Sequence, residues 1–191
     1  MKKFFISFAV GVSLFIFVFS SLFGQGTPPI EGGILPKISL PVPEDRTYKE
    51  YLGLKGTGTF LIPRIKAKVV LIQIFSMYCP HCQKNAPVVN DLFSKIAGDD
   101  SLKDNIKLIG IGAGNSDFEV DFFRKTYNIK FPMFSDAEFS IHKILGEVRT
   151  PYFIAIKISS SGTHKVIYSK LGGVSNPDEF LKTIKNLAGL K

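Results

Sequence analysis

Residues 69–82 read Val-Val-Leu-Ile-Gln-Ile-Phe-Ser-Met-Tyr-Cys-Pro-His-Cys, and this stretch decides the fold. Its first half, residues 69–75, is a nearly continuous run of β-branched, aliphatic and aromatic side chains. Such a run predicts a strand that is covered on both faces. The second half places two cysteines directly after that strand. We therefore expect a buried strand that delivers Cys79 and Cys82 to the start of the next element.

The segment after Cys79 has the apolar spacing of a helix. Apolar residues recur at intervals of three and four between Ala86 and Ile96, and Gly98 ends the pattern. A helix that starts at the first cysteine points its free N–H groups and the positive end of its dipole at that thiol. This placement favours the thiolate, which is the form that attacks a disulfide.

The two residues between the cysteines are expected to tune them. Their number lets both sulfurs reach disulfide distance across one helical turn. Pro80 suits the first helical position, and a protonated His81 would add positive charge beside Cys79 and lower its pKa. We therefore predict Cys79 as the nucleophile and Cys82 as the resolving cysteine. The Cys79–Cys82 disulfide would itself be the redox centre, with no bound cofactor.

The rest of the domain alternates strands and helices. Strands are expected at 106–111, 131–134, 152–158 and 165–168, and helices at 117–127, 138–145 and 177–190. This order predicts an α/β fold with a central mixed sheet flanked by helices. Pro132 restricts its strand to an edge or an end of the sheet. Phe118, Phe122 and Phe123 are expected on one side of their helix.

The first 24 residues are expected to target the chain to a membrane. An uncharged run, Phe4 to Phe23, follows two lysines, and twenty helical residues span about 30 Å, the thickness of a bilayer's hydrocarbon core. This length favours a membrane anchor over a cleaved signal peptide. Either alternative exports the rest, to the periplasm or the outer face of the cytoplasmic membrane. Residues 25–43 are expected to be a linker, and residues 44–191 the folded domain.

The composition narrows the function classes. The chain is 45% hydrophobic and 21% charged, as globular domains are, and its two cysteines are too few for a disulfide-held scaffold. The net charge of +8 is not organised into a recognisable nucleic-acid motif. Two cysteines with His81, His142 and His164 do not make a structural zinc site, and Gln83 excludes covalent haem attachment.

Residues 72–87 resemble the active-site strand, Cys-x-x-Cys turn and first helix of thioredoxin-fold proteins. Pro87 stands at the family's helix-kink position. Thr150 and Pro151, before a predicted strand, resemble the family's cis-proline, and cis peptide bonds are essentially a property of proline. The resemblance implies that Thr150 and Pro151 pack against the disulfide and receive the substrate backbone.

The resemblance covers about residues 36–191. The 68 residues between Cys82 and Pro151 leave room for an inserted strand–helix unit beyond a minimal thioredoxin core. With the exported N-terminus, this insertion is most similar to the TlpA/ResA-like branch. Membership of that branch implies a thiol-disulfide oxidoreductase that acts on protein thiols and disulfides outside the cytoplasm. It also implies a membrane redox partner that recycles the cysteine pair.

Three departures from this branch concern the direction of exchange. The dipeptide Pro80-His81 is associated with oxidising DsbA-like enzymes. The buried acid six residues before the first cysteine is Gln73 here, and the glutamate often found three residues after the second is Asn85. Both positions that would accept the proton of Cys82 are thus neutral amides. The architecture implies a reductase and the local chemistry an oxidase or isomerase, so the direction stays open.

Two other functions occur on related folds. A peroxiredoxin-like peroxidase needs Pro-x-x-x-(Thr/Ser)-x-x-Cys, and Ser76 fits this pattern, but Ile72 stands where the proline is required. A copper-binding chaperone would combine two thiolates with a histidine, because soft thiolates select Cu(I). His142 is the candidate for that third ligand, although the chaperone scaffold normally separates its cysteines by three residues.

Overall fold

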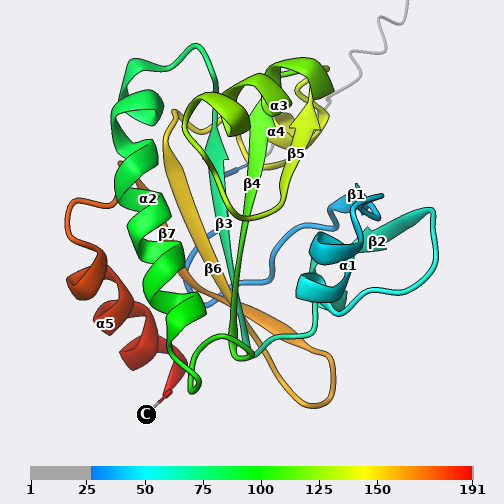
Figure 1. Ribbon diagram of the computed structural model, residues 1–191. Helices are drawn as coiled ribbons and strands as arrows, with labels where there is room; N and C mark the ends of the chain where they lie inside the picture. The colour runs from blue at the N-terminus through cyan, green and yellow to red at the C-terminus, as the bar shows by residue number, and fades with distance from the viewer. Residues whose placement is uncertain (1–26, 191) are drawn as a thin grey trace, which may run out of the picture.

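The computed structural model describes residues 27–190, so the predicted targeting segment, residues 1–24, lies outside the described part of the chain. A five-stranded mixed sheet with the order β5-β4-β3-β6-β7 forms the centre (Figure 1). Its strands are β3 (Val69–Phe75), β4 (Ile106–Ala113), β5 (Met133–Asp136), β6 (Tyr152–Ile158) and β7 (His164–Leu171). Strands β3, β4 and β5 run parallel, whereas β6 pairs antiparallel with both β3 and β7. The predicted mixed sheet is confirmed.

Both faces of β3 are covered, as its sequence predicts, and all seven of its residues are buried. Alternate residues of a strand point to opposite faces. Leu71 and Phe75 therefore pack in one core with α2 (Pro80–Gly98), α3 (Asp117–Thr126) and α5 (Pro177–Ala188). Ile72 and Ile74 pack in the second core, on the face that carries α4 (Ser140–Ile144) and the N-terminal elements (Figure 1).

The N-terminal elements form a small unit on that second face. Strands β1 (Ser39–Pro41) and β2 (Thr59–Leu61) pair antiparallel. Helix α1 (Arg46–Leu52) lies between them in the sequence, and the short helix η1 (Ile62–Arg64) follows β2. The structure differs here from the predicted linker, because Leu35, Ile38 and Leu40 are buried in the second core. Glycine and proline indicated irregular backbone correctly, but the apolar side chains between them need cover from water.

Residues 30–33 lie along the outer strand β7. The amide of Gly32 donates to the carbonyl of Val166 at 2.8 Å, and the amide of Val166 donates to the carbonyl of Gly33 at 2.8 Å. The Glu31 carboxylate also accepts a hydrogen bond from the amide of Ser169 at 3.3 Å. This stretch therefore continues the hydrogen-bonding of the sheet on the free side of β7.

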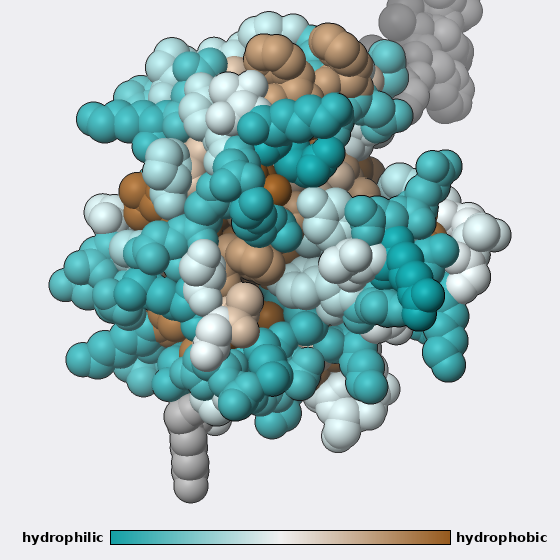
Figure 2. Space-filling view, in the orientation of Figure 1, coloured by the Kyte–Doolittle hydropathy of each residue, from teal (hydrophilic) through white to brown (hydrophobic). Residues whose placement is uncertain are grey.

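Helix α3 does not carry its three phenylalanines on one side. Val120 and Phe123 are buried, whereas Phe118 is 79% exposed and Phe122 is 52% exposed. Residues 118 and 122 are one turn apart and share the outer face, because residues four apart align on a helix. The prediction that the three phenylalanines share a side is thus wrong. Figure 2 shows apolar side chains gathered over this part of the surface.

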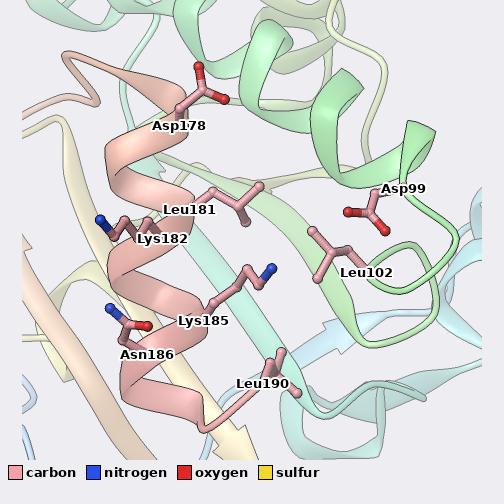
Figure 3. A pocket seen from close by; sticks show the side chains of 8 residues that line it. All are labelled: Asp99, Leu102, Asp178, Leu181, Lys182, Lys185, Asn186 and Leu190. Carbon is pink, nitrogen blue, oxygen red and sulfur yellow. The ribbon is translucent and has the colours of Figure 1, made fainter.

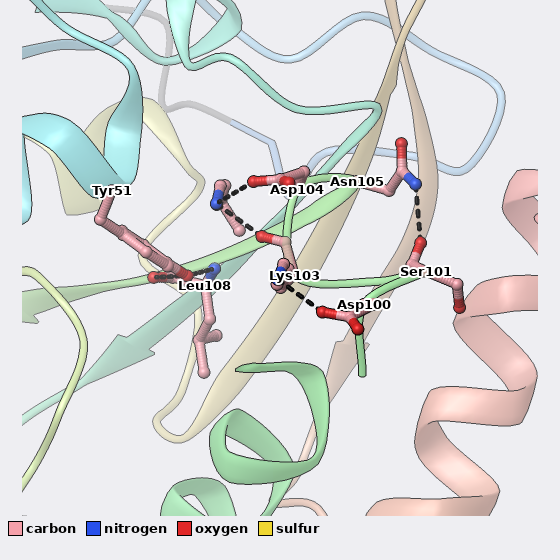
Figure 4. A network of polar contacts seen from close by, with 8 residues as sticks. Tyr51, Asp100, Ser101, Lys103, Asp104, Asn105 and Leu108 are labelled. Atoms are coloured by element: carbon pink, nitrogen blue, oxygen red, sulfur yellow. Dashed lines mark hydrogen bonds and ion pairs between the residues drawn. The ribbon is translucent and has the colours of Figure 1, made fainter. Parts of the chain in front are cut away.

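A polar network holds the end of the sheet at which β4 starts (Figure 4). The hydroxyl of Tyr51 accepts a hydrogen bond from the amide of Leu108 at 2.7 Å. Lys107 donates to the carbonyl of Lys103 at 2.5 Å, and its ammonium lies 4.6 Å from the centre of the Tyr51 ring. Burial lowers the pKa of Lys107 and raises the pKa of Tyr51. The network fixes α1 to the end of the sheet that is opposite the cysteines.

Candidate active site

Cys79 lies between the carboxyl end of β3, the central strand of the sheet, and the first residue of α2. Figure 1 shows how these two elements are arranged. It is the residue that precedes the first turn of α2, and Pro80 occupies the first helical position. The amide of Cys79 donates to the carbonyl of Ser76 at 3.1 Å, which closes the turn between strand and helix. The predicted strand–turn–helix arrangement is therefore confirmed.

The Cys79 thiol is partly exposed and lies against Thr150. Its Sγ donates a hydrogen bond to the carbonyl oxygen of Thr150 at 3.3 Å. Burial alone would raise the pKa of Cys79, but hydrogen bonds from the Thr150 side chain and from the backbone of Cys82 and His81 favour the thiolate. The balance holds the pKa of Cys79 below its ordinary value.

The second thiol has the opposite environment. Cys82 is fully buried in the core between α2 and the sheet, and neither cysteine takes part in a disulfide. Burial, together with the smaller effect of the neighbouring Cys79, raises the pKa of Cys82 to about 12. The two sulfurs are therefore unequal: one is accessible and ionises readily, and the other is enclosed and holds its proton.

His81 acts on Cys79 through its main chain. Its backbone is among the groups that lower the pKa of Cys79, while its side chain is exposed. The prediction from the sequence placed this effect on the imidazole. A helix N-terminus supplies such backbone donors whatever the side chain is, so the sequence could not separate the two contributions.

The peptide bond between Thr150 and Pro151 is cis, in agreement with the resemblance to thioredoxin-fold proteins. The register of the sheet explains how this loop reaches the cysteines. Ile74, near the end of β3, is paired with Tyr152, at the start of β6. Residues just before β6 therefore meet the start of α2, although Thr150 and Cys79 are 71 positions apart in the sequence.

Gln73 and Asn85, the two departures from the family pattern, have separate environments. Gln73 is buried on the face of β3 that packs against α2. The amide of Asn85 donates to the carbonyl of Val174 at 2.6 Å and accepts from the amide of Val174 at 3.0 Å. Asn85 thus supports the loop between β7 and α5, and its side-chain nitrogen and oxygen are both engaged. The sequence offered no signal for this partner, 89 positions away.

On α3, Glu119 contacts the residue before Cys79. The hydroxyl of Tyr78 donates to the carboxylate of Glu119, which also accepts hydrogen bonds from the amide and hydroxyl of Ser116 in a capping box. Nearby, the buried Asn115 accepts from the amide of Met77 at 2.8 Å. The sequence analysis predicted neither the contact of Tyr78 with Glu119 nor that of Met77 with Asn115. The Ser-x-x-Glu spacing is a recognisable signal for the capping box alone.

Two adjoining hollows flank Pro151 and together form what we call the Pro151 groove. One is lined on its own by Lys84, Asn85, Val88, Val174 and Ser175, the other by Arg149, Thr150, Leu171 and Gly172, and both by His81, Pro151 and Gly173. Within the described residues, every charged side chain of this lining is basic. The groove adjoins Cys79, because Thr150 lines the groove and its carbonyl oxygen accepts the hydrogen bond from the Cys79 sulfur.

A further hollow lies between α5 and the loop after α2, where Lys185 extends toward Asp99 and Leu102 (Figure 3). Its lining contains neither a cysteine nor a histidine. Lys182, an exposed residue of the same lining, also lies on α5. We give this hollow no part in the thiol chemistry, because it lies away from both sulfurs and from Pro151.

The structure bears on the two alternative chemistries. The imidazole of His142 is engaged with the carbonyl of Val148 at 2.8 Å. In residues 27–190, no group of three or more His, Cys, Asp or Glu side chains is arranged to hold a metal ion. Ile72 is buried in the middle of β3, paired with Ile109 and Ile154. That position is a strand rather than the proline-led loop of a peroxide site.

Comparison with known proteins gives a family and several relatives. The model of the AhpC/TSA family matches residues 42–169, which is more than half of the chain. The thiol-disulfide oxidoreductase ResA of Bacillus thuringiensis subsp. konkukian is 29% identical over 86 residues, which cover 45% of this chain and 47% of ResA. The match thus spans about half the length of that relative. These matches confirm the resemblance to TlpA/ResA-like oxidoreductases.

Solved structures share the fold at low sequence identity. A hypothetical protein of Sinorhizobium meliloti 1021 superposes with a TM-score of 0.61 at 15% identity, covering 84% of this chain and 85% of that one. The thioredoxin domain of a thiol-disulfide oxidoreductase from Bacteroides vulgatus has a TM-score of 0.59 at 13% identity, with 83% and 98% covered. A thioredoxin-family thiol:disulfide interchange protein of Chlorobium tepidum TLS has a TM-score of 0.56 at 18% identity, with 84% and 99% covered. The thioredoxin-like fold is thereby confirmed.

Proposed function

The chain belongs to the AhpC/TSA family, and from this premise we propose that it is a thiol-disulfide oxidoreductase acting on protein substrates through Cys79 and Cys82. The observation that carries the proposal is the inequality of the two thiols. A partly exposed thiol with a lowered pKa is suited to attack, and a buried thiol one helical turn away is suited to resolve the product.

The exchange runs in two steps. The Cys79 thiolate attacks one sulfur of a substrate disulfide, so that a mixed disulfide forms and the other substrate sulfur leaves as a thiolate. Cys82 then loses its proton and attacks the Cys79 sulfur, which releases the second substrate sulfur and leaves the Cys79–Cys82 disulfide. The substrate is reduced and the pair is oxidised. The reverse sequence donates a disulfide to a reduced substrate.

The lowered pKa of Cys79 also bears on direction. Stabilising the thiolate stabilises the reduced pair and makes its disulfide a stronger oxidant. Measuring the reduction potential against glutathione therefore decides the direction: an oxidising value marks a disulfide donor, and a strongly reducing value marks a reductase. We place this exchange outside the cytoplasm, with a membrane redox partner that recycles the pair. The uncharged run Phe4 to Phe23 supports this placement. Within residues 27–190, no helix is long and apolar enough to cross a bilayer.

The test is turnover of insulin disulfides by the purified full-length protein with a thiol donor. We expect Cys79→Ala to abolish turnover and Cys82→Ala to accumulate mixed disulfides with substrate. Thr183→Ala, which removes an exposed hydroxyl on α5, is the matched control and should behave as the wild type. Turnover by Cys79→Ala would refute the proposal. Consumption of peroxide with a thiol donor, faster than insulin reduction, would favour the peroxidase instead.

A further inference from the structure

We propose that the Pro151 groove binds a segment of the substrate protein that carries acidic side chains next to its reacting cysteine. This inference rests on the proposed function and adds a substrate class to it. The groove is the hollowed surface that adjoins the nucleophile, because Thr150 both lines the groove and contacts the Cys79 sulfur at 3.3 Å. A disulfide that reaches Cys79 therefore brings its flanking residues over this surface.

The charge of the groove comes from separate elements. Lys84 projects from α2, and Arg149 lies in the loop before Pro151. Both side chains are exposed, and neither forms a salt bridge with another of the described residues. Two cations that the fold leaves unneutralised thus flank Pro151 from both sides. Carboxylates of a bound segment would complement them, and lysines there would be repelled.

Part of the remaining lining is glycine backbone, beside the uncharged side chains of Val88, Leu171 and Ser175. Gly172 has a φ of +114°, which disfavours any other residue. A Cβ on Gly173 would lie 2.6 Å from the amide of Asn85, so this wall stays low enough for a peptide backbone to approach. The hydrogen bonds between Asn85 and Val174 hold the wall in place. Lys84 and Arg149 are the charged side chains among the described lining residues, so selection by charge falls to them.

The test compares two disulfide-bonded peptides that differ only in bearing Asp-Asp or Lys-Lys beside the cysteine. The protein contains no tryptophan, so a tryptophan in each peptide reports its reduction by fluorescence. We expect the reduced full-length protein to react about 10-fold faster with the acidic peptide at low salt. The difference should shrink as salt rises, because exposed charges are screened.

Variants locate the preference. In Lys84→Glu/Arg149→Glu the ratio of the two rates should fall to one or invert. The matched control is Lys182→Glu/Lys185→Glu on α5, which changes the net charge equally and should keep the ratio of the wild type. Equal rates for both peptides, or a preference that survives in the Lys84/Arg149 variant, would overturn the inference. Failure of the proposed function looks different: the wild type would then reduce neither peptide nor the uncharged hydroxyethyl disulfide.

Discussion

Replacing Asn85 by alanine removes both hydrogen bonds that hold Val174, at 2.6 and 3.0 Å, without touching either sulfur. Val174 is only 2% exposed, so its N–H and C=O would be left without partners and largely shielded from water. A net contribution of about 1 kcal/mol per hydrogen bond, together with the cost of the unpaired groups, gives a loss of ~2–3 kcal/mol in the free energy of unfolding.

The measurement is urea unfolding followed by far-ultraviolet circular dichroism. Ser94→Ala, on the same helix, removes one exposed hydroxyl and should change the free energy of unfolding by less than about 0.5 kcal/mol. A loss for Asn85→Ala no larger than that of the control would refute the assignment of Asn85 to the β7–α5 loop.

Asn85→Asp sharpens the same test, because aspartate keeps the acceptor and loses the donor. At neutral pH its carboxylate would face the carbonyl of Val174, and only the protonated carboxyl could donate to that oxygen. Its pKa in the folded state would thus lie above the unfolded value. A group with a raised folded pKa contributes stability that is present at low pH and lost as pH rises through the folded pKa. The deficit of Asn85→Asp relative to wild type should therefore shrink on acidification, whereas that of Asn85→Ala should not.

Two further predictions concern the thiols. His81→Ala keeps the backbone amide and should leave the pKa of Cys79 lowered, whereas His81→Pro removes that amide and should raise the pKa of Cys79. The pH dependence of alkylation by iodoacetamide measures this pKa. An equal shift in both variants would show that the imidazole, and not the amide, lowers the pKa of Cys79. The raised pKa of Cys82, about 12, stabilises the reduced fold fully below the unfolded thiol pKa, and this stability is lost as pH rises toward 12. Cys82→Ala should escape that alkaline loss in unfolding experiments, and an identical loss would contradict the assignment.

Much of the fold could be predicted because its decisive signals are local. The run from Val69 to Phe75 is apolar on both alternating faces except at Gln73, which is typical of a strand covered on both sides. Cys79 and Pro80 follow it at the start of a helix, and Pro151 precedes a strand. Each of these features is read within a few residues, so the sequence was enough to place the candidate site on its elements.

The rest depends on contacts that no local pattern encodes. The sequence showed Asn85 only as a neutral amide where relatives often carry a proton-accepting glutamate. Its structural role was not visible, because its partner Val174 lies 89 positions away. Phe118, Phe122 and Phe123 were expected on one side of their helix, whereas only Phe123 is buried. Hydrophobicity alone does not tell which side of a short helix faces the sheet. The burial of Leu35 was not predicted, because the glycines and prolines around it indicated a linker. In each case tertiary packing decides whether the side chain is buried and which group it contacts, and the local sequence is compatible with more than one outcome.

The stretch beside β7 has a consequence for solubility. An outer strand with free N–H and C=O groups is a template on which another chain can add a strand. Gly32 and Gly33 already occupy this position at Val166, so an incoming chain would have to displace them first. Residues 30–33 thus shield part of β7 from the addition of a further strand.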